Sequence, residues 1–225
     1  PLGFAVLVTP EHAAIVGANV LKTTGAPTYF SPDDLEETGL AFADLPHEPG
    51  QAAIVVLGGD SKTHRFTRAA ADRLEGQLRA LAPKWRLRIT ASRRTPIEVR
   101  ARFRAVADAI GARYWEGPDD GPNPYLAWLM FSKAAIVTED SANMLSDAAY
   151  FGMQIQIARL DGRAAKFDRL HQSLIDQGAA RWFDGGLATW TYEPLREADR
   201  VADIIVERLL ARHPQPAIPP IGQGQ

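Results

Sequence analysis

The stretch "AAIVVLGGDSKTHRFTRAAADRLEGQLRAL" (52–81) combines two patterns that together indicate the fold. Its first six residues are apolar and two glycines follow them, as expected for a strand buried on both faces of a parallel sheet. Apolar residues then recur every three or four positions from Phe66 to Leu81, which is the spacing of one helix face. A strand followed by such a helix is the unit from which α/β domains are built.

The same alternation continues along most of the chain. Strands are predicted at 52–58, 87–92, 113–117, 134–138 and 154–160, and helices at 63–81, 95–111, 123–133, 141–152, 166–178 and 195–213. Strands that alternate with helices of this length imply a parallel sheet covered on both faces. We therefore predict one doubly wound α/β domain over residues 51–213.

The helix predicted at 95–111 has clear boundary signals. Thr95 is placed to cap its start, and Glu98 three residues later completes the pattern of a capping box. Gly111 closes the helix, because glycine readily adopts the left-handed conformation found at helix ends. Asn123 is predicted to cap the next helix in a similar way.

The two ends of the chain do not continue the alternation. Residues 1–50 contain one predicted strand (3–9) and then loop-like sequence, and we expect them to pack against the sheet as the end of a preceding domain plus a linker. Residues 214–225 are rich in proline and glycine and are predicted to be disordered. Because the chain opens on strand-like sequence without an initiator methionine, we also expect further sequence upstream.

The composition excludes several classes of function. The 225 residues carry a net charge of −2, which argues against a broad basic surface for nucleic acid. The absence of cysteine excludes disulfides, thiol catalysis and cysteine-ligated metals. No apolar run reaches the roughly 20 residues of a transmembrane helix, and no signal peptide is visible. We expect a cytoplasmic protein with no metal site, for which peripheral membrane contact stays open.

The loops that follow the predicted strands are the expected ligand site, because open parallel sheets bind ligands beyond the carboxyl ends of their strands. These loops are rich in cations and hydrogen-bond donors, which favours an anionic ligand such as a phosphate ester. The candidate binding residues are Gly58, Gly59, Ser61, Lys62, Ser92, Arg93, Arg94, Asp140, Ser141, Ala142, Asn143, Met144, Asp147 and Lys166.

The segment "DSANMLSDAA" (140–149) is open to two interpretations. A helix that starts near Ser141 presents unpaired N–H groups and about half a positive charge to an anion. Asp147 then lies about 9 Å further along the helix axis, where it can accept hydrogen bonds from a ribose. In the other interpretation Asp140 or Ser141 only caps the helix and Asp147 is solvated.

Other polar positions also allow alternatives. Gly58 and Gly59 permit either a close approach of the backbone to a ligand or a turn from strand into helix. Arg93 and Arg94 form either an anion site or an ordinary surface pair. We assign packing or solvent-exposed roles to the isolated histidines His64 and His171, and a place in the core to Tyr125.

A series of short motifs resembles a known family. In order they read "PEHAAIVGANVLKTTGAP", "VLGGDSK", "SRRTP", "NPY", "VTEDSANMLSDAA", "KF" and "WTYEPL". The sequence is similar to the ELM (mitochondrial fission) family and its bacterial relatives, some of which are labelled nucleoside-diphosphate-sugar epimerases or glycosyltransferases. The resemblance covers about residues 6–210 and implies a GT-B fold with two Rossmann-like domains. Residues 51–213 would be the C-terminal, nucleotide-sugar-binding domain.

The resemblance also implies roles for particular residues. The helix after Ser141 would take the donor diphosphate, and Asp147 stands where GT-B enzymes commonly place a ribose-binding glutamate. The family pattern has "SEA" where this chain has "SDA", "GKP" where it has "GMQ", and an acid where it has Ala13. His12, which follows the strand end in "VTPEH", is the best candidate for a catalytic base.

Three functions are compatible with these observations. The first is a metal-independent glycosyltransferase that needs no cofactor and moves a sugar from a nucleotide-diphosphate donor to a cell-envelope glycan or lipid acceptor. The second is a non-hydrolysing nucleotide-sugar epimerase, which needs no acceptor. The third is a non-catalytic interaction protein, as the fission role of the plant members implies. Incubation of a donor without acceptor separates the first two.

Overall fold

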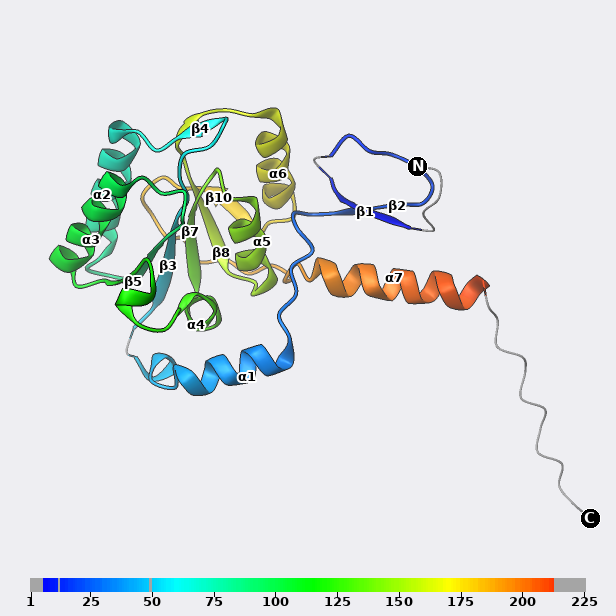
Figure 1. Cartoon of the computed structure of the whole chain (residues 1–225), viewed down its shortest axis with the longest axis horizontal. Coiled ribbons are helices and arrows are strands. Elements are labelled where there is room, and N and C mark those ends of the chain that lie inside the picture. The colour runs from blue at the N-terminus through cyan, green and yellow to red at the C-terminus, as the bar shows by residue number, and fades with distance from the viewer. Residues whose placement is uncertain (1–5, 12, 49, 213–225) are drawn as a thin grey trace, which may run out of the picture.

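The computed structural model describes residues 6–11, 13–48 and 50–212. Its centre is a six-stranded sheet in which every neighbouring pair of strands is parallel (Figure 1). The strands are β3 (Ala52–Leu57), β5 (Arg86–Ala91), β6 (Arg113–Trp115), β7 (Ala134–Thr138), β8 (Gln154–Ala158) and β10 (Ala180–Trp182). The predicted parallel sheet is confirmed, and β10 is an additional edge strand that the sequence pattern did not reveal.

The strands lie side by side in the order β6-β5-β3-β7-β8-β10. Numbered along the chain, this order is third, second, first, fourth, fifth and sixth, which is the arrangement of dinucleotide-binding Rossmann domains. The chain moves outward in one direction from β3 to β6 and then returns to the other side of β3 with β7. The loops after β3 and β7 therefore diverge at a switch point in the middle of the sheet.

Helices cover both faces of this sheet. Residues that alternate along β3 pack to opposite sides, with Val55 in a cluster beside α2 (Arg68–Leu81) and α3 (Ile97–Ile110), and Val56 in a second cluster. The helices of the second cluster are α4 (Tyr125–Met130), α5 (Ala142–Tyr150) and α6 (Ala165–Asp176). The doubly wound arrangement is thus confirmed, because each face of the sheet has its own apolar core.

The first part of the chain contains more structure than the sequence pattern indicated. Strands β1 (Leu7–Pro10) and β2 (Val20–Thr23) form their own parallel pair, which lies beside α7 (Glu197–Arg212) and away from the central sheet (Figure 1). Helix α1 (Pro32–Ala41) follows where a loop was expected. The expectation of one early strand followed by loop is therefore wrong.

The missed helix α1 does carry a local signal. Ser31 caps it by accepting a hydrogen bond from the N–H of Asp34, and the carboxylate of Asp34 accepts one from the N–H of Ser31. None of its residues is buried, so its sequence has no apolar stripe from which a helix could be recognised. The following 3-10 turn, η1 (Leu45–His47), does pack on the sheet through the buried Leu45. Packing against the central sheet thus holds for the later part of 1–50 but not for β1 and β2.

Several predicted boundaries need correction. Residues 64–65 form the short strand β4, which pairs with β9 (Asp161–Gly162), so α2 begins only after Thr67. The predicted capping role of Thr95 is wrong, because Pro96 occupies the N-cap position and no side chain caps α3. The predicted end at Gly111 is confirmed by its left-handed φ of 68°. The 3-10 turn η2 (Pro118–Asp120) precedes α4, and the predicted disordered tail lies outside the described residues.

Candidate functional site

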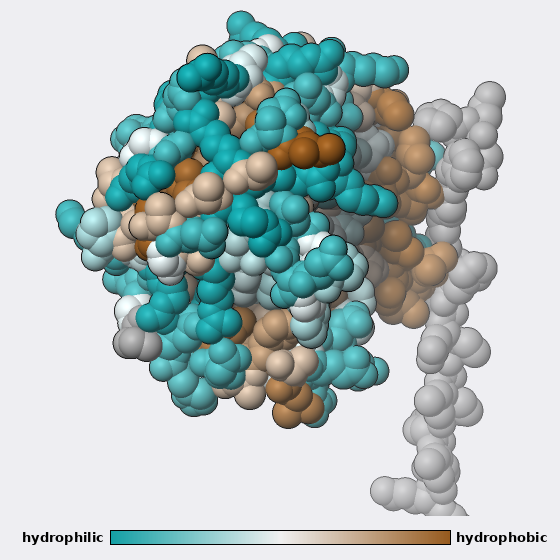
Figure 2. Space-filling model, turned by 60° about the vertical axis from the view of Figure 1, so that its left-hand side comes forward, coloured by the Kyte–Doolittle hydropathy of each residue, from teal (hydrophilic) through white to brown (hydrophobic). Residues whose placement is uncertain are grey.

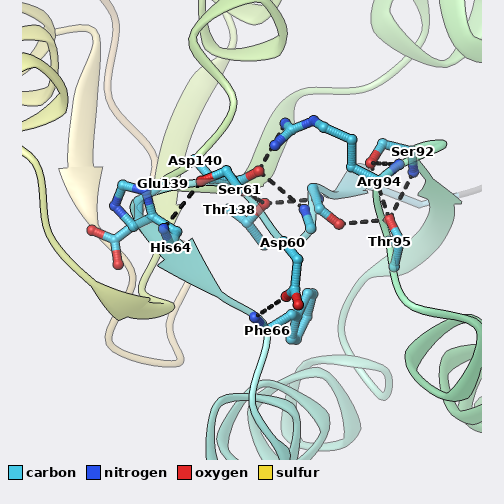
Figure 3. A network of polar contacts seen from close by, with 12 residues as sticks. Asp60, Ser61, His64, Phe66, Ser92, Arg94, Thr95, Thr138, Glu139 and Asp140 are labelled. Carbon is cyan, nitrogen blue, oxygen red and sulfur yellow. Dashed lines mark hydrogen bonds and ion pairs between the residues drawn. The ribbon is translucent and has the colours of Figure 1, made fainter.

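The loops after β3 and β7 are hydrogen-bonded to each other where they leave the sheet, before they diverge (Figure 3). The N–H of Gly58 donates to the hydroxyl of Thr138 at 2.8 Å, and the N–H of Gly59 donates to Asp140 Oδ2 at 3.0 Å. Thr95, which does not cap its helix, is buried and lies 2.5 Å from the carbonyl oxygen of Gly58. The loops after β3, β5 and β7 are therefore held together by hydrogen bonds between their own polar groups.

Asp140 is the centre of this network. Its side chain is fully buried and accepts hydrogen bonds from Gly59 and from the hydroxyl of Thr138, the latter at 2.7 Å. Arg94 closes the arrangement with an ion pair of 2.8 Å, which compensates the buried negative charge. Asp140 therefore does not cap α5; instead it holds Arg94 at the edge of the sheet.

The two glycines after β3 are required by contacts within the chain. A Cβ atom at Gly58 would lie 2.1 Å from an oxygen of Asp140, and one at Gly59 would lie 2.0 Å from the carbonyl oxygen of Arg94. Both distances are far below van der Waals contact, so a side chain at either position would push these loops apart. The close approach that the glycines allow is between parts of the protein.

A cleft of about 480 Å³ opens between the loop after β5, the region of α4 and the start of α5. It brings together seven of the predicted site residues, which are Ser92, Arg93, Arg94, Ser141, Asn143, Met144 and Asp147. Residues that were not predicted complete its lining, among them Thr90, Trp115, Asn123 and Tyr125. The cleft thus joins loops from three parts of the chain that are distant in sequence.

The start of α5 faces this cleft with backbone donors that have no partner within the helix. Ser141 is the N-cap residue, but its side chain makes no capping hydrogen bond among the described residues. Its own N–H donates to the carbonyl of Thr138. The next three N–H groups, those of Ala142, Asn143 and Met144, have no partner within the helix. The interpretation of Ser141 as an ordinary side-chain cap is therefore wrong.

Asp147 lies one and a half turns further along α5 and is half-buried. The hydroxyl of Thr28 donates to its Oδ1 and that of Tyr125 to its Oδ2, both at 2.9 Å. Burial raises the pKa of the Asp147 carboxyl, and these two hydrogen bonds only partly oppose that shift. The alternative of a solvated Asp147 is wrong, because protein hydroxyls hold both of its oxygens.

The predicted cations are divided between the cleft and the rest of the rim. Arg93 is exposed and lines the cleft, and Arg94 lines it while paired with Asp140. Lys62 and Lys166 are exposed and do not line it. Ser61 also lies outside the lining of the cleft. Its hydroxyl accepts hydrogen bonds from the N–H groups of Thr63 and His64.

Two further residues of the sequence analysis have clear positions. His171 is buried, donates from Nε2 to the carbonyl of Glu139 at 2.8 Å, and has its pKa lowered to about 4 by burial. His64 is buried as well and packs edge-on against Phe167. Of the two roles left open for these histidines, packing and solvent exposure, the structure shows packing. His12 lies outside the described residues.

Thr28 and Tyr125 are the two partners of Asp147 that the sequence did not reveal. Tyr125 was assigned to the core, and Thr28 lies in a segment with no periodic pattern. Tyr125 lies 22 positions from Asp147 in the sequence, and Thr28 lies 119 positions from it. Such contacts leave no local signal in a single sequence.

A parallel sheet with this strand order and a polar cleft beyond its strand ends defines the class of protein as Rossmann-like α/β. Residues 2–209 match the model of the family described as mitochondrial fission ELM1, and the chain belongs to that family. The resemblance inferred from the motifs is thereby confirmed. Within the described residues, none of the helices has the length and apolar character needed to span a bilayer.

Two curated proteins illustrate the relationship. The chain is 30% identical over 200 residues to mitochondrial fission protein ELM1 of Arabidopsis thaliana, an alignment that covers 86% of this chain and 46% of that protein. It is 31% identical over 162 residues to an uncharacterized protein of Rickettsia prowazekii, with coverage of 69% and 46%. The chain thus spans about half the length of the curated relatives it matches.

Proposed function

We propose that this chain binds the nucleoside diphosphate part of a nucleotide sugar in the cleft, as the donor-binding side of a GT-B type glycosyltransferase. The observation that carries the proposal is the combination of groups within one cleft. Unpaired N–H groups at the start of α5, the guanidinium of Arg93 and the held carboxylate of Asp147 all line it or border it. A volume of about 480 Å³ lies within the range of small-molecule sites.

The start of α5 suits the diphosphate. Helix N-termini bind phosphates because their free N–H groups and the positive end of the helix dipole point toward the anion. Arg93 adds a full positive charge beside these donors, and Arg94 contributes one that Asp140 partly compensates. In a transfer reaction the same groups would stabilise the charge on the departing diphosphate, which is the electrostatic contribution such a reaction requires.

Asp147 suits the ribose. An ionised carboxylate offers about four acceptor positions, and the hydroxyls of Thr28 and Tyr125 fill two of them. Two positions are left for the neighbouring 2′- and 3′-hydroxyls of a ribose. The carboxylate is already oriented before a ligand arrives, so less conformational entropy is lost on binding.

A thermal-shift screen of nucleoside diphosphates and nucleotide sugars tests the proposal. A ligand at 100 times its dissociation constant adds about 2.7 kcal/mol of stability, which raises the melting temperature by several degrees. A donor that is isomerised without any acceptor would favour the epimerase instead. The absence of a shift with every nucleoside diphosphate and nucleotide sugar would contradict the proposal.

The role of the α5 start has its own test. Ala142 is the first helical residue, a position that accepts proline, whereas Ser141 has a φ of −117° and uses its N–H internally. Ala142→Pro removes one free donor and is expected to weaken nucleoside diphosphate and pyrophosphate alike by about tenfold. Calorimetric titration measures both affinities. Ala142→Ser, which keeps the N–H, is the matched control, and unchanged affinities in the proline variant would place the phosphates elsewhere.

A non-catalytic interaction role is the second candidate, and one observation favours it. Val206, Leu209 and Leu210 on α7 are 54%, 50% and 56% exposed, and Figure 2 shows hydrophobic side chains gathered along that edge of the molecule. The Arabidopsis relative is named a mitochondrial fission protein. If the ligand screen finds no nucleotide, this candidate takes precedence.

A further inference from the structure

The segment 24–28 runs from the region of α7 to the cleft and is fastened at both ends. At its start the N–H of Thr24 donates to Glu197 Oε2 of α7 at 2.9 Å. In the middle the N–H of Ala26 donates to the hydroxyl of Ser146 on α5 at 2.8 Å. At its end the hydroxyl of Thr28 reaches Asp147, the next residue of α5.

Gly25 makes this approach possible. It has a φ of 79°, in the left-handed region that side chains disfavour, and a Cβ atom there would lie 2.4 Å from the hydroxyl oxygen of Ser146. Only a residue without a side chain lets the segment lie this close to α5. The close contact fixes the register of the segment, so that Thr28 faces Asp147 three residues later.

We propose that Thr28 is a positioning residue that orients Asp147 for recognition of a ribose diol. The inference rests on the proposed function, because it assigns a purpose to a contact inside the proposed site. Tyr125 holds one oxygen of the carboxylate and Thr28 holds the other. With both held, the plane of the carboxylate is fixed and its two remaining acceptor positions keep one orientation toward a pair of neighbouring hydroxyls. With Thr28 removed, the carboxylate is free to turn about its Cβ–Cγ bond and that orientation is lost.

The consequence is selectivity for ribose over 2′-deoxyribose. A fixed carboxylate gains from both hydroxyls of a ribose, whereas a 2′-deoxy ligand leaves one acceptor position without a donor. A carboxylate held by Tyr125 alone adapts to a single hydroxyl and distinguishes the two sugars less well. Thr28 is therefore expected to affect the affinity for the ribose ligand more than the affinity for its 2′-deoxy counterpart, and so to change their ratio.

The test compares the nucleoside diphosphate with the largest thermal shift, its 2′-deoxy counterpart and inorganic pyrophosphate. Thr28→Val keeps the shape of the side chain but removes the donor, and is expected to reduce the ribose-to-deoxyribose affinity ratio about fivefold. Thr28→Ser keeps the hydroxyl and should restore the ratio. Thr189→Val makes the same chemical change at an exposed position outside the cleft and should leave it unchanged.

Each outcome has a distinct meaning. An unchanged ratio in Thr28→Val, in a protein that binds nucleoside diphosphates, overturns the inference and leaves the proposed function standing. Equal losses for all three ligands, pyrophosphate included, also overturn it, because they would show a structural effect on α5. If the wild-type chain binds no nucleoside diphosphate, the proposed function itself fails.

Discussion

Replacement of Asp147 by alanine is expected to weaken the binding of a nucleoside diphosphate roughly 10- to 150-fold, because hydrogen bonds to a charged group contribute about 1.5–3 kcal/mol. The affinity for inorganic pyrophosphate should hardly change, since pyrophosphate has no ribose. Isothermal titration of both ligands against both proteins measures the difference. The contrast with Ala142→Pro is the informative part, because that variant should weaken both ligands.

The controls separate the ribose contact from effects on the helix. Asp108→Ala removes a carboxylate from an exposed position of α3 and should leave both affinities unchanged. Asp147→Ala also leaves the hydroxyls of Thr28 and Tyr125 without their acceptor, so its melting temperature has to be compared with that of wild type. Equal losses for nucleoside diphosphate and pyrophosphate would show that Asp147 supports α5 and does not contact the ribose.

Arg88→Ala is expected to lower the free energy of unfolding by about 3–5 kcal/mol, because removal of one partner leaves the rest of a buried polar cluster uncompensated. Arg88 is 1% exposed on the central strand β5. Its guanidinium donates to the carbonyl of Phe131 at 2.8 Å and to Glu48 at 2.7 Å. The bond to Glu48 connects the end of the first fifty residues to the sheet, and the bond to Phe131 connects the end of α4 to it. Urea denaturation of wild type and variant measures their contribution.

The pH dependence of this effect follows from Glu48. Burial alone would raise the pKa of Glu48, but hydrogen bonds from Arg88 and Arg86 outweigh it, and the pKa is lowered from its ordinary value of 4.5. A carboxyl with a lowered pKa stabilises the fold above its ordinary pKa and loses that contribution as the pH falls further. The difference between wild type and Arg88→Ala should therefore be largest near neutrality and shrink below pH 4.5.

A neighbouring arginine provides the control. Arg113 also pairs with Glu48, but its side chain is 48% exposed, so Arg113→Ala should cost about 1 kcal/mol or less. If Arg88→Ala lowered the free energy of unfolding by as little as Arg113→Ala, solvent or the other arginines would have to compensate Glu48 in its place. In that case the link between Glu48 and the sheet would not contribute to stability as the buried geometry indicates.

The sequence alone determined the central α/β architecture. Apolar runs such as 52–57 and 134–138 are short and rich in β-branched residues, which favours strands buried on both faces, and each is followed by a helix with a periodic apolar stripe. These signals are local, since burial is encoded in neighbouring residues. The sequence therefore also located the loops in which a ligand site was expected, including those of Arg93 and Ser141, and the helix that carries Asp147.

The tertiary structure alone decided how those loops are used. The strand order placed Gly59 against Asp140, and so gave that carboxylate and Arg94 to the protein's own network. The tertiary fold also brought Thr28 to Asp147, 119 positions away in sequence, and left β1 and β2 as a separate pair. Hydrogen bonds between polar side chains depend on distance and angle in space, whereas hydrophobic periodicity depends on position along the chain. A single sequence therefore records hydrophobic periodicity, but not the hydrogen bonds between distant polar side chains.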